Sequence, residues 1–319
     1  MKNETKKKIA AISLTAIIAG SLTSSVNHNH ELRSNWDPSF DKDLFSYEQL
    51  TDNYENRFSY DYENSYYVPQ GVCLDDEHIY VSLYDYKHQN QSKLNVFDMN
   101  GHFIHSFNLD NRSHVGGIAY DKNNNLIWVS SSYGNIEAYR VSDVLNKNTE
   151  IAYYKDLYVG DGLPNYINPF SNSVSFLTID GNDLYVGNFS ILTTGNVKRY
   201  TMKMDEDQTI HLLYQNQFRI PGKVQGMTFY EKNDSKYLLL SESFGEENAS
   251  RLQIFKYDHT INDYSNRKST SVDFPPMMEQ IIINGNLLYS VFESGSKPYQ
   301  NRYNGKTLRI TKMDDLSLF

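Results

Sequence analysis

The chain of 319 residues contains only one cysteine, Cys73, which excludes an intramolecular disulfide. The fold must therefore be held together by core packing and by the closure of its sheets. Long apolar segments are also scarce. The mean hydropathy of -0.60 excludes a protein that crosses a membrane many times.

Motifs of the common catalytic centres are missing. The chain has no G-x-S-x-G nucleophile elbow, no H-E-x-x-H motif, no phosphate-binding P-loop and no cluster of cysteines and histidines. Ser113 and His114 are neighbours in sequence only, which does not indicate a catalytic dyad. The sequence thus identifies no reaction.

Positive charge is in the minority, with 30 lysines and arginines against 39 acidic residues and a formal net charge of -9. Residues 1–24 carry four lysines and one glutamate, so the rest of the chain has a formal charge of -12. An acidic surface repels nucleic acid and anionic polymers unless a cation bridges them. We therefore expect no nucleic-acid partner.

The one long apolar run lies near the N-terminus. Lysines at positions 6–8 precede the apolar segment Ile9–Leu22, and the small residues Ser21–Ser25 follow. This order is typical of a secretory signal peptide, and the run is short for a membrane span, although an uncleaved anchor is the alternative. We expect a signal peptide over 1–24 and a polar linker or rim segment over 25–55. After cleavage of the signal peptide, we expect a secreted, extracellular monomer that has no membrane anchor and is either free or associated with the cell wall.

What the chain has in abundance is a repeated pattern of short strands. Tyrosine occurs 26 times and aromatic residues make up 14%, which favours half-buried strands. The repeat has a period of about 50 residues, which is typical of a β-propeller. Polar turns containing Asp, Asn or Gly separate its first two strands. The second strand of each copy lies at His78–Ser82, Leu126–Ser130, Asp183–Gly187, Lys236–Ser241 and Leu288–Val291.

These repeats predict an all-β, five-bladed β-propeller over residues 56–319. The fifth copy is one strand short, whereas Arg57–Val68 precedes the first copy and resembles an additional strand. We therefore predict that this N-terminal strand completes the last blade and closes the ring, which removes an open sheet edge. A sixth blade built from residues 40–68 is the alternative.

The loops that follow the second strands should all open on one face of a propeller. These loops combine carboxylates, aromatic rings and a few bases, a mixture that can stack on sugars and bind their hydroxyls, or form a protein-binding patch. Solvated loop composition is the alternative interpretation. The candidate binding residues are Asp85, Tyr86, His88, Tyr133, Asn188, Glu242, Phe244, Glu293 and Tyr299.

A second candidate site lies where the first strands begin, around the central channel. Gln70, Gln225 and Glu279 precede first strands, and Glu279 carries the only formal charge among them. One carboxylate with amide oxygens suits weak Ca²⁺ binding better than zinc. The alternative is that these polar groups bond to each other and to trapped water.

Several segments resemble a largely uncharacterised group of secreted β-propeller proteins of Gram-positive bacteria. The resemblance covers most of residues 66–315 and is strongest in SESFG with SRLQIF, and in PPMMEQ with FESGSKPY. The blades that begin with Gln-Gly are more distantly similar to lactonase-like and SdiA-regulated-type propellers. The lactonase relatives hold a divalent cation with Glu, Asn and Asp; Glu279 matches the Glu, and the Asn and Asp have no clear match.

Three functions remain open. The first is a secreted, non-catalytic propeller that binds a glycan, a peptide or a cell-surface component on its loop-rich face. The second is a metal-dependent hydrolase of the lactonase or calcium-nucleotidase kind that uses the central channel. The third is a rigid interaction scaffold with no small-molecule site.

Overall fold

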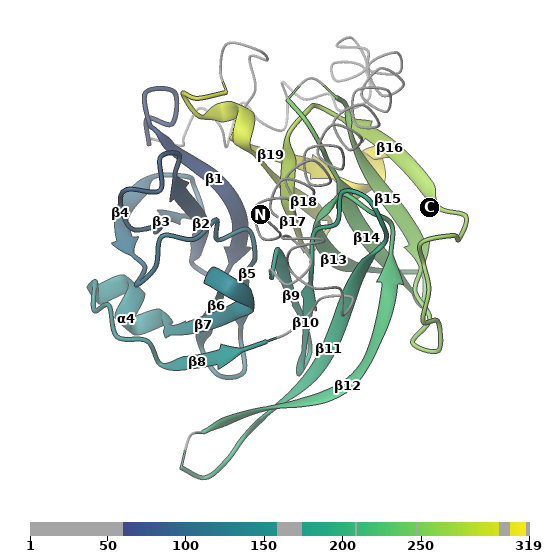
Figure 1. Ribbon diagram of the computed structural model, residues 1–319, viewed down its shortest axis with the longest axis horizontal. Coiled ribbons are helices and arrows are strands. Elements are labelled where there is room, and N and C mark those ends of the chain that lie inside the picture. Colours follow the sequence, from purple (N-terminus) through teal and green to yellow (C-terminus); the bar gives the residue numbers. More distant parts are fainter. Residues whose placement is uncertain (1–59, 158–173, 208, 247, 300–306, 317–319) are drawn as a thin grey trace, which may run out of the picture.

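The computed structural model describes residues 60–157, 174–207, 209–246, 248–299 and 307–316. They form five antiparallel sheets around one axis, so the five-bladed prediction is confirmed (Figure 1). In every blade the strands follow each other as a meander from the axis outwards. The predicted signal peptide and linker, residues 1–55, lie outside the described residues.

The blades are defined by the following strands. Blade 1 contains β1 (Tyr67–Leu74), β2 (His78–Asp85), β3 (Lys93–Asp98) and β4 (Phe103–Asn108). Blade 2 contains β5 (Ile118–Asp121), β6 (Leu126–Ser130), β7 (Asn135–Arg140) and β8 (Tyr153–Asp156). Blade 3 contains β9 (Phe176–Asp180), β10 (Asp183–Gly187), β11 (Gly195–Met204) and β12 (Ile210–Ile220). Blade 4 contains β13 (Val224–Lys232), β14 (Ser235–Glu242), β15 (Ser250–Lys256) and β16 (Thr270–Phe274). Blade 5 contains β17 (Met278–Asn284), β18 (Leu287–Phe292) and β19 (Leu308–Lys312).

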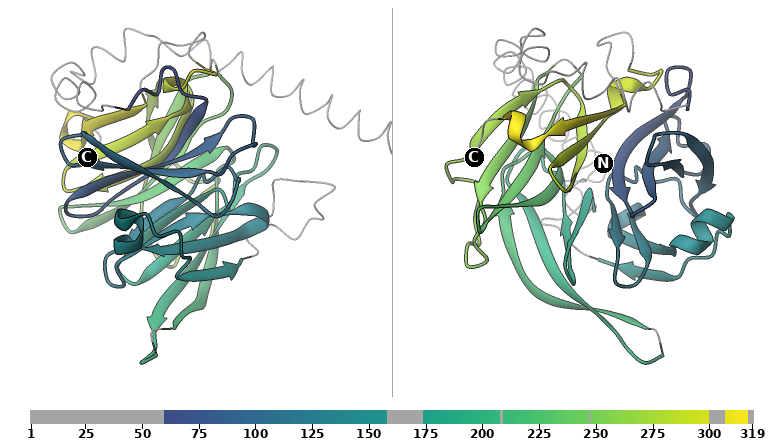
Figure 2. Two further views of the ribbon diagram at one scale, coloured as in Figure 1. Left: turned by 90° about the vertical axis from the view of Figure 1, so that its left-hand side faces the viewer. Right: turned by 180° about the vertical axis from the view of Figure 1, so that it is seen from behind.

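Helical segments are short. They are η2 (Ser132–Gly134), α4 (Val141–Asn146), η3 (Glu293–Gly295) and η4 (Met313–Leu316). Within the described ranges, no helix has the length and apolar character needed to cross a bilayer. The β11–β12 hairpin extends well beyond the other blades (Figures 1 and 2).

The hydrophobic core lies in the joints between blades. The innermost strands contact each other in the order β1, β5, β9, β13, β17 and back to β1. Five separate apolar clusters are buried, and each one joins two neighbouring blades, including blade 5 to blade 1. Both faces of a central strand are therefore covered, which explains why β2 is buried from Ile79 to Asp85. A closed ring needs no disulfide, in agreement with the single, buried Cys73.

Closure of the ring differs from the strand predicted over Arg57–Val68. Arg57–Ser59 lie outside the described residues, 60–66 form no strand, and Tyr67 and Val68 belong to β1, where they pair with Asp85 and Tyr84. In the described part of the chain, blade 5 has three strands. The prediction of a closing strand was therefore wrong over residues 60–68, because 60–66 form no strand and Tyr67 and Val68 belong to the innermost strand of blade 1.

Side chains join the N-terminal segment to the ring instead. Tyr62 is 4% exposed and packs in the cluster between blades 5 and 1, where its ring lies 6.5 Å from that of Phe97. Lys297 donates its backbone N–H to the carbonyl of Ser65 at 3.2 Å. The segment thus connects the first and last blades through aromatic burial and a backbone hydrogen bond.

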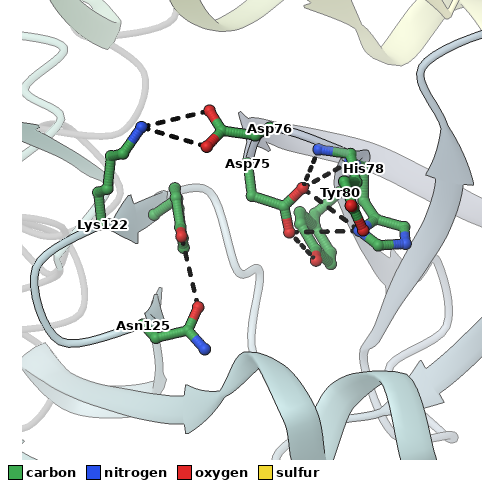
Figure 3. A network of polar contacts seen from close by, with 8 residues as sticks. Asp75, Asp76, His78, Tyr80, Lys122 and Asn125 are labelled. Carbon is green, nitrogen blue, oxygen red and sulfur yellow. Dashed lines mark hydrogen bonds and ion pairs between the residues drawn. The ribbon is translucent and has the colours of Figure 1, made fainter.

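The turns between first and second strands follow the predicted chemistry. Asn125, Gly181, Asn233, Asp234 and Gly285 have positive φ angles of 50° to 61°, which Gly, Asn and Asp adopt at low cost. In blade 1 the turn is organised by a carboxylate (Figure 3).

Asp75 accepts the backbone N–H of His78 at 2.5 Å and the hydroxyl of Tyr80 at 2.6 Å. Next to it, Asp76 forms an exposed ion pair with Lys122 of blade 2 at 3.2 Å. These turns lie on the face opposite the ends of the second strands, so their charges are separated from the candidate site by the depth of the ring.

Candidate functional site

The candidate site begins with a backbone irregularity that three blades share. The pairing of inner and second strands shifts by one residue between Pro69 and Gly71, between Val224 and Gly226, and between Met278 and Ile281. Such β-bulges redirect side chains that would otherwise follow the pleat. Gln70, Gln225 and Gln280 occupy the same position in these three bulges.

Gln280 fills the axis of the ring. Its carboxamide accepts the backbone N–H of Ile118 in blade 2 at 3.0 Å and donates to the carbonyl oxygens of Ile118 at 2.6 Å and Leu177 in blade 3 at 3.2 Å. A Cβ atom on Gly71 would lie 2.7 Å from the carboxamide oxygen, so glycine is needed at that place. The axis is therefore closed by a fully satisfied polar side chain that the sequence analysis did not select.

Two carboxylates lie beside this plug, that of Glu279 buried and that of Glu293 partly buried. Glu279 is 4% exposed and its Oε1 accepts from Nε2 of Gln225 at 3.3 Å. Glu293, the first residue of η3, accepts from Nε2 of Gln70 at 2.6 Å. Of the three predicted metal ligands, Gln225 thus contacts Glu279, whereas Gln70 contacts the other carboxylate, and both amides present nitrogen.

The backbone fixes the second carboxylate. Met277 follows two prolines and adopts a left-handed conformation with φ of 68°. Its carbonyl oxygen accepts the backbone N–H of Glu293 at 3.1 Å, and Oγ of Ser296 donates to the carbonyl of Glu293 at 2.7 Å. These contacts hold η3 against the start of β17 and bring Glu293 to the same cavity as Glu279.

Burial disfavours the charged form of both carboxylates. It raises the pKa of Glu279 well above its usual value, and the nearby charge of Glu293 raises it further. Burial also raises the pKa of Glu293 to about 7, although hydrogen bonds from Gln70 and Tyr84 act in the opposite direction. Near neutral pH the pair therefore holds at least one proton, and the two groups titrate together.

A cavity of about 140 Å³ opens between blades 4 and 5 on the face where the second strands end. Five predicted residues line it, namely Gln225, Phe244, Glu279, Glu293 and Tyr299. The remaining lining residues are Ser243, Gly245, Glu246 and Met277.

Aromatic rings flank the cavity. Tyr299 meets Tyr86 edge to face at 5.7 Å, and Phe244 lies 6.4 Å from Phe189. Tyr86 is 45% exposed, so part of this aromatic surface is open to solvent. The cavity therefore combines a charged floor with an apolar rim.

Histidine 114 also approaches the carboxylates. Its Nε2 lies 3.9 Å from Oε1 of Glu293, and its ring stacks on Tyr84 with centroids 4.2 Å apart. Tyr84 was not among the predicted residues, although its hydroxyl lies 3.4 Å from that of Tyr299. Tyr84 directly precedes Asp85 at the end of β2, so its position at the strand end could have identified it as a candidate site residue.

Other predicted residues support loops instead of lining the cavity. Asp85 accepts the backbone N–H groups of Gln89 at 3.0 Å and Asn90 at 2.9 Å. Burial acts to raise the pKa of Asp85, but these hydrogen bonds outweigh it and the pKa is lowered. Asn188 accepts the backbone N–H of Asn196 at 2.8 Å and closes the β10–β11 hairpin.

Three further predicted residues are also not part of the cavity. His88 stacks on Tyr84 at 5.2 Å from the side that faces its own loop. Glu242 accepts from Nε2 of Gln253 at 2.5 Å and stays within blade 4. The backbone of Tyr133 lies in η2, and its side chain is outside the described part of the structure.

Two alternatives for the site carry less weight. A wider hollow of about 630 Å³ lies on the opposite face beside blade 4, where Lys236 pairs with Asp180 at 2.5 Å. It contains none of the predicted residues. Across the described ranges, no group of three or more His, Cys, Asp or Glu side chains is arranged to hold a metal ion.

Comparisons with known proteins were made with the sequence and with the fold. No protein-family model matches the chain. No curated protein matches it either.

Among solved structures, it is similar to the RRP9 WD40 repeats, with a TM-score of 0.45, 9% identity and coverage of 79% of this chain and 96% of that chain. It is also similar to a chain of the mitotic checkpoint complex (TM-score 0.42, 12% identity, coverage 77% and 74%) and to one of the nidogen/laminin complex (0.40, 15%, 71% and 73%). At these values nothing known of those proteins transfers to this chain, and the propeller is established by its own five sheets.

Proposed function

We propose that this propeller is an exported, monomeric binding protein whose loop-rich face takes a glycan, a peptide or a cell-surface component. The observation that supports the proposal is the cavity of about 140 Å³ that unites the carboxylates of Glu279 and Glu293 with Phe244 and Tyr299. Small sites with an apolar rim and a few convergent polar groups are typical of ligand recognition. The closed axis below it makes the cavity a pocket instead of a passage.

The chemistry of the rim agrees with this role. Tyr86 is exposed beside the partly buried ring of Tyr299, and a sugar ring or an apolar side chain can stack on this aromatic surface. Glu246 and Glu293 supply acceptors for hydroxyl or amino groups at the cavity. The acidic composition of the chain argues against nucleic acid as the partner.

The experiment is binding of the purified chain to an array of synthetic peptides and glycans. Wild type should bind a defined subset, and Tyr299→Ala should weaken that binding at least tenfold, because the ring forms one wall of the cavity. The matched control is Tyr214→Ala, since Tyr214 is 55% exposed on β12, far from the site, and should leave binding unchanged. Equal binding by both variants, or no binding by wild type, contradicts the proposal.

A metal-dependent hydrolase is the second candidate function. The observation that favours it is the pair of carboxyls at one cavity, both with raised pKa values, because a carboxyl that keeps its proton near neutral pH can serve as a general acid. The ion expected from the sequence for Glu279 with amide oxygens is Ca²⁺, whereas both amides in the structure present nitrogen to the carboxylates. A thermal shift with Ca²⁺ against a chelator tests it: the melting temperature should rise if the site holds the ion, and an unchanged value contradicts this candidate.

A further inference from the structure

We propose that the cavity between blades 4 and 5 binds a primary ammonium group carried on a short alkyl chain, as in the side chain of lysine. This inference rests on the proposed binding function and names the chemical class of its ligand. It is argued from three features of the cavity, namely its acceptors, its size and its aromatic rim.

The acceptors match an ammonium group in number. Glu279 and Glu293 each present a carboxylate to the cavity. The carboxylate of Glu246, which also lines the cavity, is a third acceptor. The –NH₃⁺ group has three donors and no acceptor, so it can engage one oxygen of each.

Gln70 holds one of these carboxylates in place. Its Nε2 donates to Oε1 of Glu293 at 2.6 Å. Its own side chain is fully buried and does not line the cavity.

The size of the cavity limits the ligand. Its volume of about 140 Å³ is small, since drug-sized ligands occupy clefts of about 300–1,000 Å³. An aminobutyl group has five non-hydrogen atoms, whereas a complete hexose is more than twice as large. A lysine side chain can therefore enter while the backbone that carries it stays at the rim.

The aromatic rim favours a cation as well. Phe244 lines the cavity, and Nζ of Lys223 lies 5.3 Å from the centre of its ring. Aromatic faces attract ammonium groups in this way. The contact shows that the ring of Phe244 accepts an ammonium group at its face.

Other charged and titratable groups also lie near the carboxylates. Glu246 lines the cavity and adds negative charge. Neutral Tyr84 and Tyr299 donate or accept hydrogen bonds, and among the described residues His114 is a base within 4 Å of Glu293. The balance of these groups favours a cation over an anion.

The test is titration calorimetry of the full chain with n-butylammonium, with n-butanol as the neutral probe of the same shape. We expect butylammonium to bind and butanol not to bind. Glu293→Gln should weaken the binding at least tenfold, which corresponds to about 1.4 kcal/mol. Glu231→Gln is the matched control, because it removes the same charge from the opposite face and should leave the affinity within twofold.

Two further arms identify the source of the ammonium group. Nα-acetyl-lysine amide represents a peptide, and glucosamine represents an amino sugar; the size of the cavity predicts that the lysine derivative binds more tightly. Equal binding of butanol, no loss in Glu293→Gln, or binding of Ca²⁺ with no binding of butylammonium overturns the inference. If an array ligand binds in a manner sensitive to Tyr299→Ala but butylammonium does not displace it, the proposed function stands and this inference fails.

Discussion

Asp85 and Glu293 occupy the same position in neighbouring blades. Ser82 and Ser290 are equivalent, since each pairs with the residue that follows the bulge of its inner strand, Gly71 and Ile281 respectively. Asp85 and Glu293 each lie three residues after that serine. Both carboxylates lie on the same face of the ring. The hydrogen bonds from its own loop lower the pKa of Asp85, whereas burial raises the pKa of Glu293 to about 7.

The difference comes from the loop that follows each residue. After Asp85 the chain turns through His88 with φ of 51° and directs backbone N–H groups at the carboxylate. At Glu293 the chain forms η3, and the carboxylate accepts hydrogen bonds from Gln70 and Tyr84 and lies near the carboxylate of Glu279. Equivalent residues therefore stabilise a loop in one blade and line a cavity in the next.

The largest effect on stability should come from replacing Gln280, whose side chain is fully hydrogen-bonded at the axis. Gln280→Leu leaves the backbone groups of Ile118 and Leu177 at the axis without partners. We expect the free energy of unfolding to fall by about 4 kcal/mol in denaturant titrations. Gln225→Leu, which removes one hydrogen bond of 3.3 Å, should cost far less; equal losses would show that the axis is not held by Gln280.

Removal of the satisfied carboxylate should have the next largest effect. Asp85→Ala deprives the β2–β3 loop of its central acceptor, so we expect a loss of about 3 kcal/mol in the free energy of unfolding. The control is Asp76→Ala, since Asp76 is 83% exposed and its ion pair with Lys122 contributes little. Similar melting temperatures for the two variants would contradict a structural role for Asp85.

The pH dependence of stability should separate the two acids. The folded protein raises the pKa of Glu293 from 4.5 to about 7, so it binds more protons than the unfolded chain between those values. Stability should therefore fall by about 2 kcal/mol as the pH rises from about 5 to about 7. Asp85, whose pKa is lowered from 3.8, should contribute stability that is lost only as the pH falls below that value. Denaturant titrations across this range measure both, and a flat profile between pH 5 and 7 for wild type would rule out the raised pKa.

The smallest effect should have the opposite sign. Glu293→Gln keeps the shape of the side chain and removes a buried charge, so we expect it to stabilise the fold by about 1 kcal/mol near pH 8. Its pH profile between pH 5 and 7 should also become flatter than that of wild type. A destabilised Glu293→Gln would mean that the carboxylate serves the fold, as Asp85 does.

The architecture could be predicted because it depends on a repeated pattern. Apolar second strands that recur at a regular interval must be packed against a neighbouring blade on each face, and five such blades in a ring form five interfaces. The absence of a closing strand over residues 60–66 could not be predicted, because the aromatic residues around Tyr62 satisfy both a strand pattern and burial between blades.

The site was predicted in part for a related reason. Phe244, Glu293 and Tyr299 were found from their place at strand ends, and the structure brings them to one cavity. Gln280 was overlooked although it occupies the middle of E-Q-I as Gln70 and Gln225 do in P-Q-G and V-Q-G. Only the strand register shows that Glu279 lies one position before the glutamine of its bulge. The contrast between Asp85 and Glu293 depends on loop conformations that residue types do not encode.

The amide at the axis also imposes an order on biosynthesis. Gln280 lies 162 residues after Ile118 and 103 after Leu177, its two partners in the earlier blades. During translation those backbone groups must wait for most of the chain to leave the ribosome before they are satisfied. Blades 2 and 3 can therefore reach their final form only late, and the nascent ring has an exposed centre on which a chaperone can act.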